Sequence, residues 1–435
     1  MARPAAGAGG QAQVAGLLLS ALAFGCANQG EPPGGPPRTT PAAILRTTPE
    51  SGAVVPGFRG KAVVQFDEVI DEAPGSGGGA GAITGLAQKI VLSPVAGDVN
   101  VSWHRSAIHV HPEEGWKPDR VYHLEVLPGI ADLRRNVTKT GATIVFSTGG
   151  PIPSAAISGT ALMWVEQRLL TQAVIRAAPL PDTAAYVTLT DSAGNFRLQG
   201  IRPGRYRVWA IQDQNNNRRQ DRREPFDTVS VTVDSTASAV LWAFVHDTIG
   251  PRIRTIESVD SVTLRINFSS PLDPARPPDT TAVRVFALPD TTPVVVRALY
   301  RPAQFDSLQA RARAVADSVK RLQDTTARKD TTARKGAPTP AAPRAPALAG
   351  APGARRDTTA ARVDTARVRR LLAQRPVPYD RLVVQTARLL TPGAKYLVRV
   401  RGAINLSGVA TDGLGVIEIP VPKPAPRDTT KAKKP

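Results

Sequence analysis

The stretch "AYVTLTDSAGNFRLQGIRPGRYRVWAIQD", residues 185–213, decides the fold because apolar side chains occupy every second position of two short runs. Such alternation is typical of β-strands that face a core on one side. The alternating apolar residues are Phe196, Leu198, Tyr206, Val208 and Ala210. The segments "DSAG" and "RPG" have the composition of turns. We expect two strands of a small sandwich, with Phe196, Tyr206 and Trp209 among its aromatic packing groups.

Similar runs continue on both sides of this stretch. "AVVQF", "RVYHLEVL" and "ATIVFST" precede it, "TVSVTV" and "AVLWAF" follow it, and Gly, Pro, Asp or Asn separate the runs. From Ile44 to Thr148 the runs have no convincing helical period. The sequence therefore predicts an all-β chain of tandem β-sandwich domains.

The carboxyl-terminal block repeats the spacing of the amino-terminal block. The matched residues are Pro118, Tyr122 and Ile130 in the first copy and Pro392, Tyr396 and Ile404 in the second, at offsets of 4 and 12. The runs that end at Phe66 and Phe268 match as well. The interval from Phe to Pro is 52 residues in the first copy and 124 in the second, so the second copy contains 72 extra residues. These coincide with a low-complexity tract rich in Pro, Ala and Arg.

The net charge of +19 at first suggests a nucleic-acid partner. Residues 303–380 hold 16 Lys or Arg against 7 Asp or Glu, and residues 421–435 hold five against one. Most of the excess therefore lies in sequence with too few apolar groups to fold alone, which predicts a disordered basic insertion and tail. Long-range attraction to polyanions without base recognition follows from such charge. We expect no nucleic-acid partner, and an anionic envelope glycan or peptidoglycan is the more plausible polyanion.

The amino-terminal segment "MARPAAGAGGQAQVAGLLLSALAFGC", residues 1–26, is typical of a secretory signal. Its apolar run is too short to span a membrane. Cys26 is the only cysteine in the chain. A lone cysteine directly after such a signal resembles the lipobox of bacterial lipoproteins, although Ala23 stands where leucine is usual. The resemblance implies that Cys26 is lipidated and that the protein is an exported, membrane-anchored lipoprotein of the outer membrane. The alternative is an ordinary signal peptide that leaves a free thiol.

Two blocks resemble known envelope modules. The first, with "TPESGAVVP" (48–56), "WKPDRVYHLEVLPGIADLRRN" (116–136) and "IVFSTGG" (144–150), resembles the bacterial Ig-like domain of S-layer proteins. The second, with "ISGTA" (157–161) and the stretch quoted above, resembles the prealbumin-like, carboxypeptidase-regulatory-like β-sandwich that follows it in many lipoproteins. The third block is similar to a divergent Ig-like copy. The resemblance implies an envelope protein without enzymatic activity.

The sequence thus predicts seven segments. They are a lipoprotein signal peptide (1–26), a Pro/Gly linker (27–43), an Ig-like domain (44–150), a prealbumin-like sandwich (151–247), a split Ig-like domain (248–302 and 381–420), the basic insertion (303–380) and a basic tail (421–435).

The segment "DQNNNRRQDRRE", residues 213–224, has the spacing of a calcium loop. Oxygen ligands at positions 1, 3, 5, 9 and 12, with a backbone carbonyl at position 7, form such a site. The corresponding residues are Asp213, Asn215, Asn217, Arg219 (carbonyl), Asp221 and Glu224. Arg218 replaces the usual glycine at position 6, and four arginines oppose three carboxylates. The prediction is a weak structural calcium ion, with no other cofactor, and the alternative is a polar turn that caps its own backbone.

Other candidate sites are weaker. His109 and His111 lie on one face of an expected strand, but no third ligand is evident. The segment "GSGGGAGAITG" (75–85) lacks the Lys-Ser/Thr of a phosphate loop. No nucleophile motif or paired-cysteine site is present in the sequence. We therefore expect a non-enzymatic structural or adhesion module, with an electrostatic tether to peptidoglycan or another anionic polymer as the alternative and the protein partner unknown.

Overall fold

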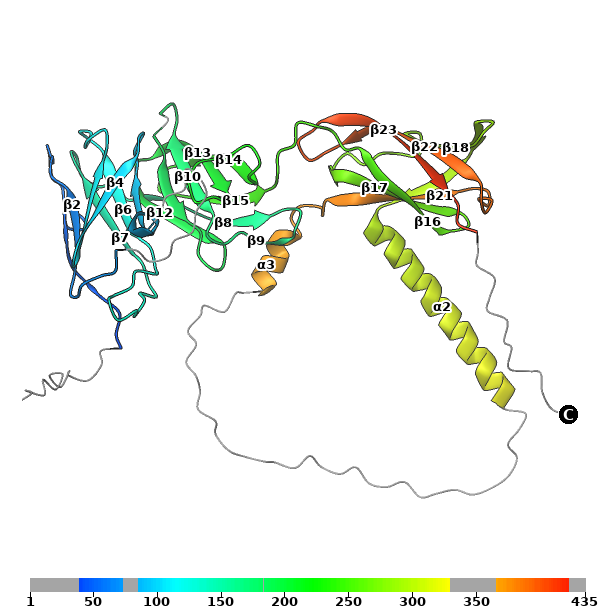
Figure 1. Cartoon of the computed structure of the whole chain (residues 1–435), viewed down its shortest axis with the longest axis horizontal. Helices are drawn as coiled ribbons and strands as arrows, with labels where there is room; N and C mark the ends of the chain where they lie inside the picture. The colour runs from blue at the N-terminus through cyan, green and yellow to red at the C-terminus, as the bar shows by residue number, and fades with distance from the viewer. Residues whose placement is uncertain (1–38, 73–84, 183, 329–364, 422–435) are drawn as a thin grey trace, which may run out of the picture.

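The computed structural model describes residues 39–72, 85–182, 184–328 and 365–421, and these residues form three β-sandwiches in a row (Figure 1). We call them the first sandwich (39–150), the second sandwich (151–247) and the third sandwich (248–421). Each has two sheets and its own cluster of buried apolar side chains. The all-β prediction is confirmed.

In the first sandwich one sheet has the strand order β1-β2-β5-β4 and the other β3-β6-β7. Phe66, Tyr122 and Phe146 are among the side chains buried between the sheets. The elements are β1 (Ile44–Thr48), β2 (Ala62–Phe66), the 3-10 helix η2 (Gly85–Lys89), β3 (Ile90–Ser93), β4 (Val99–His104), β5 (Ala107–Pro112), β6 (Val121–Val126) and β7 (Ala142–Ser147).

The second sandwich pairs a sheet β11-β10-β13-β14 with a sheet β12-β8-β15, and β9 pairs with β8. Its strands are β8 (Ala155–Met163), β9 (Arg168–Leu169), β10 (Val174–Pro179), β11 (Tyr186–Leu189), β12 (Asn195–Ile201), β13 (Gly204–Ile211), β14 (Phe226–Val233) and β15 (Thr236–Ala243). The turn after Ile201 does not close a hairpin, since β12 pairs with β8 whereas β13 pairs with β10 and β14. The chain therefore crosses from one sheet to the other there.

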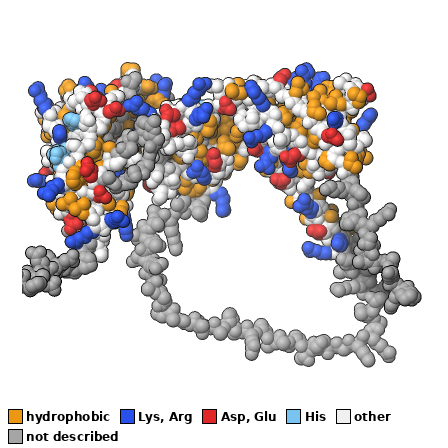
Figure 2. Space-filling view, in the orientation of Figure 1, with side chains coloured by type: hydrophobic (Ala, Val, Ile, Leu, Met, Phe, Trp, Pro, Cys, Tyr) orange, Lys and Arg blue, Asp and Glu red, His pale blue; other side chains and the backbone are white. Residues whose placement is uncertain are grey.

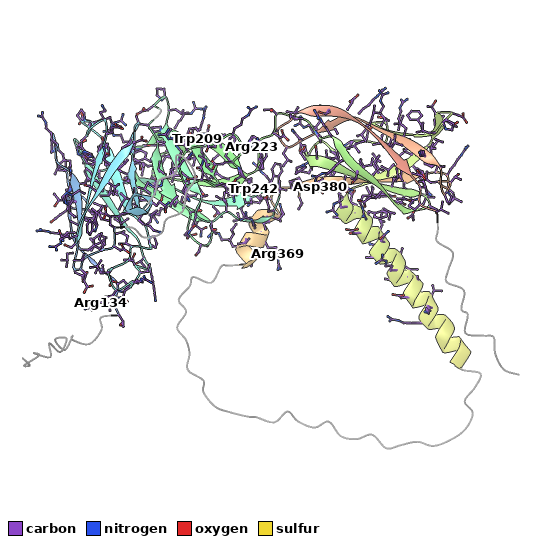
Figure 3. All side chains as sticks on the ribbon, in the orientation of Figure 1. Arg134, Trp209, Arg223, Trp242, Arg369 and Asp380 are labelled. Carbon is purple, nitrogen blue, oxygen red and sulfur yellow. The ribbon has the colours of Figure 1, made fainter. Side chains whose placement is uncertain are left out.

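The alternation in the second sandwich predicts its core correctly except at one aromatic residue. Phe196 and Tyr206 are buried in the core. Trp209 is half-buried and points out of the core, because it is one position out of phase with Val208 and Ala210 on β13. The prediction that Trp209 belongs to the core was wrong, and Figure 3 labels its position.

The third sandwich has the strand order of the first, with one additional edge strand, β19. Its sheets are β16-β17-β21-β20 and β19-β18-β22-β23, so β16, β17, β21 and β20 take the places of β1, β2, β5 and β4. The strands are β16 (Ile253–Asp260), β17 (Thr263–Leu272), β18 (Val283–Ala287), β19 (Thr292–Val294), β20 (Val296–Tyr300), β21 (Tyr379–Thr386), β22 (Lys395–Ile404) and β23 (Ala410–Glu418). Ile253 pairs with Phe268 as Ile44 pairs with Phe66, each beside a register shift.

The basic insertion separates β20 from β21, at the place where the first sandwich has the tight turn between β4 and β5. Its two ends are helical: α2 (Pro302–Arg328) projects from the third sandwich, and α3 (Thr365–Leu372) lies beneath the second (Figure 1). The insertion is therefore helical at both of its ends. Phe305 explains where α2 begins, since its ring is buried against the third sandwich, 6.1 Å from that of Tyr300.

Several predicted segments lie outside the described residues: the signal with Cys26, the middle of the insertion (329–364) and most of the tail and of the glycine-rich loop. Among the described helices, none combines the length and the apolar character that crossing a membrane requires.

Candidate functional site: the junction of the first two sandwiches

Strand β6 is buried on both of its faces. Tyr122, Leu124 and Val126 point into the core of the first sandwich. His123 and Glu125 point the other way and are also buried, with 2% and 8% of their surface exposed. The outward face of a strand in a sandwich is normally exposed to solvent, so its burial means that another domain covers it. The covering unit is the second sandwich.

Contacts from β11 explain this burial. The backbone N–H of Val187 donates a 2.9 Å hydrogen bond to Ser93 Oγ on β3. The ring of Tyr186 lies 4.9 Å from that of His123. The Thr188 hydroxyl bonds to the Glu125 carboxyl. The junction is thus a packed interface with polar pairs inside it.

The loop between β13 and β14 contains the predicted calcium residues, and it closes on itself through hydrogen bonds. Asp213 accepts the backbone N–H groups of Asn217 and Arg218. Glu224, which is 4% exposed, accepts those of Gln214 and Asp221. The side-chain amides of Asn215 and Asn217 both donate to Asp221, at 2.6 and 3.0 Å. The structure therefore brings together the side chains that the spacing singled out.

This arrangement corresponds to the alternative of a self-capped turn. The Asn215 and Asn217 amide nitrogens face Asp221, whereas a calcium ion would need their oxygens there. Within the described part of the chain, no three His, Cys, Asp or Glu side chains are grouped so as to hold a metal ion. Calcium binding by this loop stays a prediction, and it requires both amides to turn over.

Arg218 has a role that the sequence reasoning missed. Its backbone is in the left-handed region, with φ of 55°, and its guanidinium donates to the carbonyls of Gln88 and Ile90 in the first sandwich. Burial lowers the pKa of Arg218 to about 10, against the attraction of Asp213 and Glu125. The arginine that replaces the usual glycine of a calcium loop is therefore a bridge between two sandwiches.

Arg219, the next residue, makes a weaker link. It forms a 2.9 Å ion pair with Asp98, and both side chains are largely exposed, at 69% and 78%. Such exposed pairs contribute little because water screens them. Arg218 is the arginine that fixes the junction.

Glu125 and His123 are ionisable groups whose pKa values move in opposite directions. Burial raises the pKa of Glu125 to about 7, although Thr188 and Arg218 partly offset this effect. Burial lowers the pKa of His123 to about 4. Both groups are therefore largely uncharged at mildly acidic pH, between these two pKa values, which suits their burial at the interface.

A cleft of about 820 Å³ opens beside these groups, between the first two sandwiches. The first sandwich supplies Gln88, Lys89, Glu125, Leu127, Pro128 and Lys139, and the second supplies Thr171, Gln172, Val174, Leu189, Thr190, Asp191, Ser192, Gln212, Asp213, Asn216 and Arg218. Most of these side chains are polar, so the cleft suits a hydrogen-bonding ligand.

The second and third sandwiches are joined by the segment after α3. The Trp164 indole N–H donates to the Pro376 carbonyl, and the Arg375 guanidinium lies 5.3 and 5.5 Å from the rings of Trp164 and Trp242. The side-chain amide of Asn405 donates to two carbonyls of the linker before β16. Figure 3 labels Trp242 near α3, at the end of the second sandwich.

His109 and His111 lie on the same outward face of β5, as predicted, whereas His123 lies on β6 in the other sheet. His104 and His109 stack with ring centroids 4.0 Å apart. Burial and the charges of His104 and Lys61 lower the pKa of His109. A third metal-ligating side chain does not join this pair among the described residues.

Comparison with known protein families gives a match over the first sandwich. Residues 38–148 match the bacterial Ig-like domain family. The Ig-like domain is therefore the first sandwich, and its β3-β6-β7 sheet contacts the second. No curated protein sequence matches the chain.

Solved structures with similarity to parts of the chain include a pilin, an S-layer protein and an alpha-2-macroglobulin. The major pilin subunit BcpA of Bacillus cereus has 9% identity and a TM-score of 0.17, covering 46% of this chain and 69% of the pilin. The amino-terminal part of the bacterial S-layer protein SbsC has 15% identity and a TM-score of 0.16, covering 46% and 44%. Native alpha-2-macroglobulin from Escherichia coli has 14% identity and a TM-score of 0.17, covering 57% and 84%. TM-scores this low carry no argument about function.

Proposed function

We propose that the protein is a non-enzymatic lipoprotein of the cell envelope, in which the three sandwiches act as a spacer and adhesion module. The observation that supports this most is the pair of built junctions between successive sandwiches, through Arg218 and through Arg375. Independent domains on flexible linkers would need neither. Three sandwiches held in a row give reach, and their loops and clefts give surfaces for a partner.

Small-angle X-ray scattering tests the spacer. The expected curve is that of the row of sandwiches in Figure 1, with the insertion free to vary. A curve that requires the sandwiches to tumble independently would contradict the proposal. Substitution of Arg218 and Arg375 together should move the protein toward that second curve.

The basic insertion favours a second function, an electrostatic tether to peptidoglycan or another anionic polymer. On the face shown in Figure 2, Lys and Arg are interspersed with Asp and Glu over all three sandwiches, so no single-sign surface competes with the insertion there. Residues 303–380 and 421–435 together account for most of the net charge of +19. Binding through such segments weakens as salt rises.

Cosedimentation with purified peptidoglycan tests the tether at low and high salt. Binding should fall with salt and weaken when residues 329–364 are replaced by an uncharged linker of equal length and residues 422–435 are deleted, since each change removes a net charge of +4. These changes leave the residues of α2 and α3 in the chain. Salt-independent binding, or binding that is undiminished in this variant, would overturn the tether.

A further inference from the structure

The cleft between the first and second sandwiches contains polar side chains without partners. The side chains of Lys89, Lys139, Gln172 and Gln212 line it, and none of them makes a hydrogen bond or ion pair with another described residue. The Gln88 side-chain nitrogen at its wall is buried and also unpaired. Unused polar groups at the wall of a cavity are what a ligand site presents.

The acidic residues of the cleft are engaged elsewhere. Asp213 accepts two backbone N–H groups of its own loop, and Asp191 accepts those of Ala193 and Asn195 in the turn after β11. Glu125 is buried and bonded to Thr188. Lys89 and Lys139 are thus the charged lining residues whose side chains bond to no other described residue, and together with Arg218 they outnumber the carboxylates of Asp191 and Asp213.

The remaining lining determines the chemistry of the ligand. Gln172, Gln212 and Asn216 each present an amide with a donor and an acceptor, which matches neighbouring hydroxyls on a sugar ring. Leu127 and Pro128 add an apolar patch for its C–H face. The volume of about 820 Å³ exceeds that of a single small anion and accommodates several sugar rings.

We propose that this cleft binds an acidic oligosaccharide, with Lys89 and Lys139 pairing its carboxylates and Gln172 and Gln212 bonding its hydroxyls. The proposal rests on the adhesion role proposed above and gives that role a ligand class and a site. In this proposal the sandwiches recognise a specific ligand, and the basic insertion contributes only nonspecific electrostatic attraction.

Isothermal titration calorimetry of the protein with tetragalacturonate, a carboxylated tetrasaccharide, tests the proposal, with uncharged maltotetraose as the comparison. The charge-reversed variant Lys89→Glu/Lys139→Glu should lose about tenfold or more in affinity, since both proposed ion pairs become repulsive. The matched control is Lys61→Glu/Lys117→Glu, which makes the same charge change outside the cleft. It should stay within about twofold of the wild type, because distant charges are screened.

A second variant separates a sugar site from simple anion attraction. Gln172→Ala/Gln212→Ala keeps every charge and should still weaken binding about fivefold through lost hydrogen bonds. Thermal melts verify that all variants fold. The proposal is overturned by the absence of saturable binding in the wild type, by equal losses in cleft and control variants, or by maltotetraose binding as tightly as tetragalacturonate. Membrane fractionation tests the envelope role separately, because the location of the protein does not depend on whether the cleft binds a sugar. A protein that is found in the membrane fraction but does not bind tetragalacturonate would overturn the cleft proposal alone.

Discussion

The phenol oxygen of Tyr396 accepts a 2.9 Å hydrogen bond from the backbone N–H of Thr391, five residues earlier. Tyr122 accepts the equivalent bond from Lys117, at 2.8 Å and with the same separation. Both tyrosine rings are buried in the core of their sandwich. The repeated spacing in the sequence therefore reflects the same tyrosine-to-backbone hydrogen bond in both sandwiches.

Tyr396→Phe should lower the free energy of unfolding of the third sandwich by about 1 kcal/mol, because the Thr391 N–H loses its acceptor. Calorimetry measures the change. Tyr300→Phe is the matched control in the same sandwich, since the Tyr300 hydroxyl lies 3.4 Å from Gln385 and makes at best a weak bond. Equal losses in the two variants would contradict this role of Tyr396.

Arg218→Asn should loosen the first junction, because two carbonyls lose a charged donor while asparagine still tolerates the left-handed backbone. We expect a loss of roughly 2–3 kcal/mol, in line with hydrogen bonds to charged groups. Limited proteolysis of the link near residue 150 measures the opening. Arg219→Asn, one residue further on, should change little; if it has the same effect as Arg218→Asn, the bridge is not specific to Arg218.

Glu125→Gln should change how stability depends on pH. The pKa of Glu125 is about 7 in the folded protein, above its ordinary value of 4.5, so the folded state holds a proton that the unfolded chain releases between these values. The stabilisation from Glu125 is present below pH 4.5 and is lost as pH rises to 7. Glutamine does not titrate, so the variant does not lose this stabilisation. The difference between the melting temperatures of the variant and the wild type should therefore increase as pH rises from 4.5 to 7. A difference that does not vary with pH would refute the account.

His123→Gln should show the opposite trend. The folded pKa of His123 is about 4, below its ordinary 6.5, so its contribution is lost as pH falls through this range. The two groups offset each other, and each single variant should therefore depend on pH more steeply than the wild type. Melts from pH 4 to 7.5 give the comparison, and parallel curves for all three proteins would exclude the offset.

Calcium binding by the 213–224 loop is tested by melting the protein in about 10 mM calcium or in chelator. A site with a dissociation constant of roughly 0.1–1 mM would stabilise the second sandwich by about 1.5–3 kcal/mol at that concentration. Asp221→Asn should abolish the shift. An unchanged midpoint in the wild type would remove the calcium reading and leave the self-capped turn.

Much of the fold could be predicted from local pattern. Alternation identified Phe196 and Tyr206 as core residues, and the repeated offsets identified the third sandwich as a copy of the first, because both depend only on spacing along the chain. The crossover after Ile201 could not be predicted, since the "RPG" turn fits a hairpin equally well. Burial of Glu125 also escaped prediction, because the unit that covers it lies some 60 residues away in the sequence.

For the 213–224 loop, too, the sequence predicted some features and not others. Its spacing predicted which side chains would lie together, and the structure brings Asn215, Asn217 and Asp221 into contact, with the amide nitrogens rather than the oxygens facing Asp221. The direction of the Asn215 and Asn217 amides and the reach of Arg218 depend on the neighbouring sandwich, which no local pattern describes. The arginine that weakened the calcium prediction is the most informative residue of the loop.

Lipidation of Cys26 is the measurement that tests the envelope role most directly. Cells that express the wild type or Cys26→Ser are labelled with radioactive palmitate and separated into membrane and soluble fractions. The account predicts a labelled wild-type protein in the membrane fraction and an unlabelled Cys26→Ser protein in the soluble fraction. An unlabelled wild-type protein that leaves the membrane on washing would contradict it.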